Sequence, residues 1–134
     1  MPMSGAESVA RLLSCPVAQL SSCYAGDMDY EISVEDYARL RGEAKPPVLL
    51  DVREQWEFET AHIEGALLMP MGEVTSRAHN ELDPDEHIVV LCHHGQRSLS
   101  VTAWLRQQGF EQAQSLAGGI EQWSRAVDGT VPRY

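Results

Sequence analysis

Basic side chains, cysteines and long apolar stretches are all scarce in this sequence of 134 residues. Ten Lys and Arg stand against twenty Asp and Glu, and the formal net charge of -10 repels phosphate backbones and anionic lipid surfaces. We therefore expect neither nucleic acid nor membrane among the partners. No apolar run is long enough to span a bilayer, and the first residues do not resemble a secretory signal.

Only three cysteines occur, Cys15, Cys23 and Cys92, and their spacing matches neither a zinc-binding pattern nor a disulfide framework. An odd number of thiols without a framework is typical of a reducing compartment. We therefore expect a cytoplasmic protein that holds no metal and no cofactor. Any chemistry of these thiols must come from their local surroundings.

Short apolar runs alternate with amphipathic segments from Tyr30 onward. Pro47–Asp51 and His87–Leu91 are too short for helices and rich in strand formers, which is typical of buried strands. Shorter strands are expected at residues 30–32, 65–68 and 113–116, and helices at residues 33–42, 54–60, 72–82, 97–108 and 120–127. The alternation predicts an α/β fold in which a mostly parallel sheet carries helices on both faces.

The chain is long enough for one packed core and too short for two. Apolar residues between Ser8 and Leu20 have roughly helical spacing, but Pro16 interrupts the pattern. We interpret residues 1–27 as an N-terminal extension that is partly helical or disordered, and residues 28–134 as the folded domain.

Cys92 directly follows the most apolar predicted strand and precedes a predicted helix. In such a loop, backbone N–H groups and the positive end of the helix dipole face one point above the sulfur. Gly95 can supply the positive φ angle that a tight loop needs, and Arg97 adds a cation. We therefore expect Cys92 to be a reactive thiolate, which is both a nucleophile and a stable seat for a transferred sulfur atom.

The spacing of this loop narrows the chemistry. Four residues separate Cys92 from Arg97, whereas thiol phosphatases place five between the same groups, because a phosphoryl group needs a wider ring of donors. The stretch from His87 to Phe110 contains no Asp or Glu, which predicts a site for an anion. Phosphate or arsenate chemistry stays an alternative that the short spacing disfavours.

The loop Cys92–Ser98, with the pattern C-x-x-G-x-R-S, resembles the active-site loop of the rhodanese-like sulfurtransferases. Three further segments resemble other motifs of that family in the same order: Leu50–Arg53 with Glu57 and Phe58, Ala61–Ala66, and Leu116–Trp123. Ala61 stands where the family more often has glycine, a change beside a turn rather than at the reacting group. The resemblance covers roughly residues 29–126 and implies a single-domain, thiosulfate sulfurtransferase type of protein with a three-layer sandwich around a five-stranded sheet.

The resemblance also implies an enzyme whose catalytic residue is Cys92. The residues implied to bind the substrate are His93, His94, Gly95, Gln96, Arg97 and Ser98. Asp51 and Arg53, at the end of a buried strand, are expected to form a structural pair. In the implied reaction, Cys92 takes sulfane sulfur from a small anionic donor such as thiosulfate, becomes a persulfide and passes the sulfur to cyanide, a thiol or a sulfur-relay protein.

Several alternatives remain open at this stage. The chain could be a sulfur-carrier or sensor module that accepts a persulfide from a partner and has little turnover of its own. Cys92 could be a buried structural cysteine, and Cys15 or Cys23 could act as a resolving thiol, although nothing in the sequence positions them. His93 and His94 could orient the donor or could be exposed loop residues without a role.

Overall fold

The computed structural model describes residues 28–134. The predicted N-terminal extension, residues 1–27, lies outside the described residues, and so do Cys15 and Cys23.

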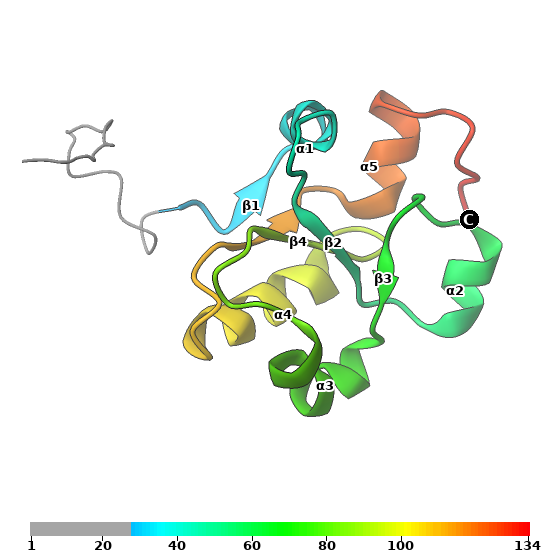
Figure 1. Ribbon diagram of the computed structural model, residues 1–134. Coiled ribbons are helices and arrows are strands. Elements are labelled where there is room, and N and C mark those ends of the chain that lie inside the picture. Colours follow the sequence, from blue (N-terminus) through cyan, green and yellow to red (C-terminus); the bar gives the residue numbers. More distant parts are fainter. Residues whose placement is uncertain (1–27) are drawn as a thin grey trace, which may run out of the picture.

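The described chain is built on one sheet of five parallel strands (Figure 1). The strands are β1 (Glu31–Ile32), β2 (Val48–Asp51), β3 (Leu67–Leu68), β4 (Ile88–Leu91) and β5 (Ala113–Leu116). Their order across the sheet is β1-β5-β4-β2-β3, and each neighbouring pair is parallel. The two runs predicted to be buried strands, β2 and β4, therefore lie side by side at the centre, with Leu50 opposite Val90.

Helices cover both faces of this sheet, as Figure 1 shows. They are α1 (Val34–Arg41), α2 (Gln55–Thr60), α3 (Val74–Glu81), α4 (Gln96–Gln107) and α5 (Gly119–Ala126), with a short 3-10 helix η2 (Met71–Glu73) before α3. α3 and α4 pack on one face, and α1 and α5 pack on the other. The predicted α/β sandwich is therefore confirmed, and in the described chain the sheet is entirely parallel. No helix within residues 28–134 has both the length and the apolar character needed to cross a membrane.

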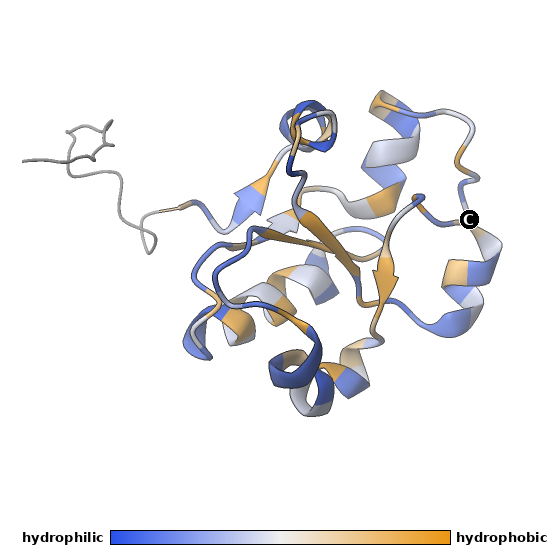
Figure 2. Cartoon of the chain, viewed as in Figure 1, coloured by the Kyte–Doolittle hydropathy of each residue, from blue (hydrophilic) through white to orange (hydrophobic). Residues whose placement is uncertain are grey.

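Side chains of the central strands alternate between two apolar cores. Leu50 and Val90 point into the core under α3 and α4, whereas their neighbours Leu49 and Val89 point into the core under α1 and α5. Because both faces are covered, β2 and β4 appear as continuous apolar runs in the sequence and as hydrophobic strands in Figure 2. Each fully buried aliphatic side chain contributes about 1.5–3 kcal/mol of transfer free energy.

Two elements differ from the expected boundaries for local reasons. The strand expected at residues 65–68 is only Leu67–Leu68, because Gly65 sits in a turn with φ of 87°. The helix expected at residues 72–82 begins as the 3-10 turn η2, in which the Glu73 N–H donates to the Pro70 carbonyl at 2.7 Å. The elements that flank Cys92 match their predicted positions to within one residue.

The first turn of α5 holds the loop that follows β4. The N–H groups of Ile120 and Glu121 donate to the carbonyl oxygens of Cys92 and His93, at 2.9 and 3.1 Å. These N–H groups have no partner within their own helix, so the loop carbonyls satisfy them. A Cβ atom on Gly119, whose φ is 62°, would overlap both carbonyl oxygens, so only glycine allows this close approach.

We expect Gly119→Ala to lower the free energy of unfolding by about 2–4 kcal/mol, because the new methyl group overlaps backbone and the residue keeps a left-handed conformation. Gly109→Ala is the matched control: its φ is 98°, but no atom lies within 4 Å of the new Cβ, so only the strain of about 1 kcal/mol remains. Urea denaturation measures both losses. Equal losses would show that the contact with the Cys92 loop has no energetic weight.

Candidate active site

Cys92 lies at the carboxyl end of the central strand β4, where the chain turns into α4. Its side chain is buried, with 1% of its surface exposed. Gly95 precedes the first residue of α4 in a left-handed conformation, with φ of 108°. A ligand site at this edge of a parallel sheet is common, because loops from neighbouring strands converge there.

Three donors or acceptors of the loop surround the sulfur atom. The N–H groups of Gly95 and Ser98 donate to Cys92 Sγ at 3.0 and 3.3 Å, and the Ser98 hydroxyl lies 3.4 Å from it. Ser98 is in the first turn of α4, so the positive end of that helix dipole also faces the sulfur. The loop therefore directs two backbone donors and a helix N-terminus at a single sulfur atom.

A second hydroxyl supports Ser98 from the neighbouring strand. Ser115 on β5 is fully buried, and its Oγ lies 2.7 Å from Ser98 Oγ. The Ser98 hydroxyl also donates to the Gly95 carbonyl at 3.1 Å. Because a hydroxyl can donate and accept, Ser98 can accept from a Cys92 thiol or turn to donate to a thiolate, while Ser115 keeps a partner in either case. The sequence shows no pattern that would have singled out Ser115.

Arg97 is paired with a carboxylate from a distant segment. Its guanidinium donates to Glu57 Oε1 and Oε2 at 2.8 and 2.9 Å. Hydrogen bonds from Arg97 are the main reason that the pKa of Glu57 falls to about 2, and the Glu54 N–H contributes as well. The same contacts with Glu57 raise the pKa of Arg97. The sequence around Cys92 contains no acidic residue, but the fold places one beside the loop. That residue is Glu57 on α2, forty residues before Arg97 in the chain.

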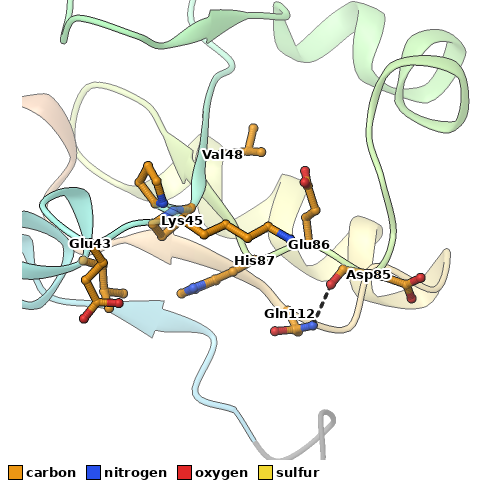
Figure 3. Close-up of a pocket in the computed structure, with 10 residues that line it drawn as sticks. Glu43, Lys45, Val48, Asp85, Glu86, His87 and Gln112 are labelled. Atoms are coloured by element: carbon orange, nitrogen blue, oxygen red, sulfur yellow. Dashed lines mark hydrogen bonds between the residues drawn. The ribbon is translucent and has the colours of Figure 1, made fainter.

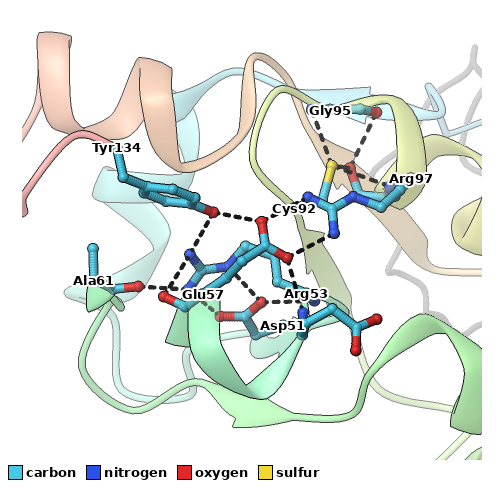
Figure 4. A network of polar contacts seen from close by, with 10 residues as sticks. Asp51, Arg53, Glu57, Ala61, Cys92, Gly95, Arg97 and Tyr134 are labelled. Carbon is cyan, nitrogen blue, oxygen red and sulfur yellow. Dashed lines mark hydrogen bonds and ion pairs between the residues drawn. The ribbon is translucent and has the colours of Figure 1, made fainter. Parts of the chain in front are cut away.

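Asp51 and Arg53 form a fully buried pair beside the loop, as Figure 4 shows. Nε and Nη2 of Arg53 donate to the two carboxylate oxygens of Asp51 at 2.9 and 2.7 Å. The remaining donors reach the carbonyls of Glu57 and Ala61 and the hydroxyl of Tyr134. A buried guanidinium needs such complete pairing, because an unpaired charge in the core is costly.

Tyr134 connects the two ion pairs. Its hydroxyl accepts from Arg53 at 2.9 Å and donates to Glu57 at 2.8 Å. Burial is the main cause that raises the pKa of Tyr134 to about 12. Its ring stacks on His93 with centroids 4.1 Å apart, and His93 stacks on His94 at 4.0 Å. Nothing in the sequence indicated that Tyr134 would lie beside the cysteine loop.

The predicted substrate-binding residues occupy four different settings, and the pairing of Arg97 with Glu57 is one of them. Gly95 and Ser98 contact the sulfur directly. His93 is partly buried within the aromatic stack, and burial, followed by the neighbouring His94, lowers its pKa. His94 and Gln96 are exposed at the surface of the loop.

A separate hollow of about 240 Å³ lies at the amino ends of the strands, opposite the end that carries Cys92 (Figure 3). Val48 and His87 line it where β2 and β4 begin, together with charged side chains such as Lys45 and Glu86. Parallel strands place this hollow a full strand length from Cys92. It therefore takes no part in chemistry at the cysteine.

Comparisons with known proteins agree with this geometry. The rhodanese-like domain family matches residues 33–126. The putative sulfur carrier protein YrkF of Bacillus subtilis is 37% identical over 94 residues, which are 70% of this chain and 50% of that protein. The adenylyltransferase and sulfurtransferase UBA4 of Meyerozyma guilliermondii is 34% identical over 113 residues, which are 79% of this chain and 26% of that protein. The chain thus spans half or less of the length of these relatives.

A solved structure shows the same fold in a protein of similar size. The human single-domain sulfurtransferase TSTD1 superposes with a TM-score of 0.65 at 26% identity, and the match covers 74% of this chain and 98% of that one. The family match takes in each segment that the cysteine site uses except Tyr134. The chain belongs to the rhodanese-like domain family.

Proposed function

We propose that this protein transfers sulfane sulfur from a donor to a thiophilic acceptor through a persulfide on Cys92. The observation that carries the proposal is the pair of backbone N–H groups, from Gly95 and Ser98, that donate to Cys92 Sγ. Two amides and a helix N-terminus around one sulfur stabilise its negative charge without a separate base.

The reaction has two displacement steps. The Cys92 thiolate attacks the sulfane sulfur of the donor, and the donor's bond to that sulfur breaks, with the electron pair leaving on the donor. A nucleophilic acceptor, such as cyanide or a thiol, then attacks the outer sulfur of the persulfide and regenerates the thiolate. The outer sulfur needs donors that stay in place between the steps, and the loop amides meet that need because α5 holds the loop from behind.

The pairing of Arg97 with Glu57 supports the proposal by restraining the other side of the loop. Arg97 is in the first turn of α4, one residue from Ser98, so a displaced Arg97 would move a donor of the sulfur. Glu57 in turn is held by the Glu54 N–H at 2.9 Å and by the Tyr134 hydroxyl. The ion pair is thus a positioning contact for the loop.

We expect intact-mass analysis after incubation with a sulfane-sulfur donor to show an added mass of about 32 Da, one sulfur atom, on the wild-type protein. Cys92→Ser should show no such adduct and should form no thiocyanate from donor and cyanide. The double variant Cys15→Ser with Cys23→Ser is the matched control and should keep both signals. An adduct that persists in Cys92→Ser would place the reacting sulfur elsewhere.

A carrier role is the second candidate, favoured by the similarity to a putative sulfur carrier protein. A carrier would accept sulfur at Cys92 but release it only to a partner. The two candidates differ in turnover: with excess donor and cyanide, an enzyme forms many equivalents of thiocyanate per Cys92, whereas a carrier is persulfidated once and forms almost no thiocyanate.

The lowered pKa of Glu57 predicts that the free energy of unfolding decreases at acidic pH. Its folded value of about 2 lies below the usual 4.5, so ionised Glu57 stabilises the fold fully above about pH 4.5, and this contribution is lost as the pH falls towards 2. We expect Glu57→Gln to remove about 2 kcal/mol of this pH-dependent stability. Urea denaturation at a series of pH values measures it, and Glu59→Gln, an exposed acid on the same helix, should keep the wild-type pH dependence. If the free energy of unfolding of Glu57→Gln falls with pH as steeply as that of wild type, Glu57 is not the source of the pH dependence.

A further inference from the structure

We propose that the donor suited to Cys92 is a small thiol persulfide, R–S–SH, rather than the thiosulfate dianion, and that Glu57 sets this preference by neutralising Arg97. The inference rests on the proposed sulfur transfer. It concerns the charge that the site can accept, which is a separate property from its ability to form a persulfide.

Both guanidinium groups beside the loop already have a carboxylate partner. Arg97 is bound through two nitrogens by Glu57, whose side chain is only 5% exposed. Arg53 is fully buried and forms a bidentate ion pair with Asp51. In each pair, therefore, the negative charge cancels the positive charge close to its source.

His93 and Tyr134, whose rings stack beside the loop, are both uncharged near neutral pH. Burial lowers the pKa of His93, so its ring is neutral there. Tyr134 keeps its proton, because its pKa is raised to about 12. Glu121 on α5 lies 4.0 Å from His93 Nε2 and pairs with Arg125 and Arg133. These two guanidiniums are 56% and 53% exposed, so water and salt screen their charge. His94 is exposed on the solvent side of this stack.

The two donors differ in the charge that must gather at the sulfur. With thiosulfate, the thiolate attacks the sulfane sulfur of a dianion, the sulfur–sulfur bond breaks, and sulfite leaves with the electron pair, while Cys92 becomes an anionic persulfide. With R–S–SH, the same attack releases the thiolate R–S⁻ and leaves Cys92–S–SH, with the proton still on the outer sulfur. The first reaction gathers three negative charges and the second gathers one, and neither needs an external oxidant or reductant.

The loop amides can stabilise a single negative charge at the sulfur. They carry no net positive charge that would balance the three negative charges of a thiolate and a thiosulfate dianion. Hydrogen-bond donors such as the Gly95 and Ser98 N–H groups are dipoles, whose attraction falls off faster with distance than that of a free guanidinium. A deprotonated persulfide still carries one charge less than thiosulfate. The burial of Cys92, with 1% of its surface exposed, favours a small molecule over a protein-bound donor.

The main test compares the rates at which Cys92 becomes persulfidated by thiosulfate and by cysteine persulfide, followed by quenched intact-mass analysis. We expect cysteine persulfide to react about tenfold faster or more in wild type. Glu57→Gln should raise the ratio of the thiosulfate rate to the cysteine persulfide rate about tenfold, because it frees the charge of Arg97, whereas a displaced loop would slow both reactions alike. Glu59→Gln, which removes the same charge from an exposed position of α2, should leave both rates at wild-type values.

A second measurement does not involve sulfur transfer. Iodoacetamide and iodoacetate alkylate a thiolate by the same displacement and differ by one negative charge. We expect Glu57→Gln to shift the ratio of their rates at Cys92 about tenfold towards iodoacetate, and Glu59→Gln to leave it unchanged. In wild type, iodoacetamide should exceed iodoacetate by a larger factor than it does with free cysteine, a comparison that stands even if Glu57→Gln fails to fold.

The outcomes separate this inference from the proposed function. If no donor persulfidates Cys92, the proposed sulfur transfer fails. If thiosulfate reacts as fast as cysteine persulfide in wild type, or if the alkylation ratio is the same in Glu57→Gln, sulfur transfer stands and the charge selectivity is overturned.

Discussion

The peptide groups of the Cys92 loop point in two opposite directions, and the site depends on both. On the inner side, the N–H groups of Gly95 and Ser98 point at the sulfur. On the outer side, the carbonyl groups of Cys92 and His93 point at the first turn of α5. The N-terminus of α4 thus faces the sulfur atom, while the N-terminus of α5 holds the loop in the conformation that makes this possible. Gly119 is required at the junction because the two backbones touch there.

The polar residues around this loop form one connected network with little net charge. Two carboxylate–guanidinium pairs, Asp51 with Arg53 and Glu57 with Arg97, are joined by the hydroxyl of Tyr134 (Figure 4). Such a network fixes the positions of these side chains without creating a strong electric field, because each charge has a partner of opposite sign nearby. Next to the sulfur, the unneutralised positive ends of dipoles are then those of the backbone N–H groups, which act over a short range.

Residue patterns in the sequence were sufficient for the sheet and for the position of Cys92, because apolar runs and glycines act locally. The run before Cys92 had the length of a buried strand, and Gly95 marked the tight turn that follows. The partner of Arg97 could not be found in the same way. Glu57 lies on another helix, and a contact between segments forty residues apart leaves no periodic signal in the sequence. The same holds for Tyr134 and Ser115, whose roles arise only from tertiary contact.

The hydrogen bonds from α5 to the Cys92 loop also have a consequence during protein synthesis. α5 and Tyr134 follow the cysteine loop in the sequence, so both leave the ribosome after it. Synthesis proceeds at about 5–20 residues per second, so a nascent chain presents the thiol on an incomplete sheet for a second or more. In that interval the Cys92 loop lacks its N–H partners from α5, and a thiol that is buried in the folded protein can meet solvent.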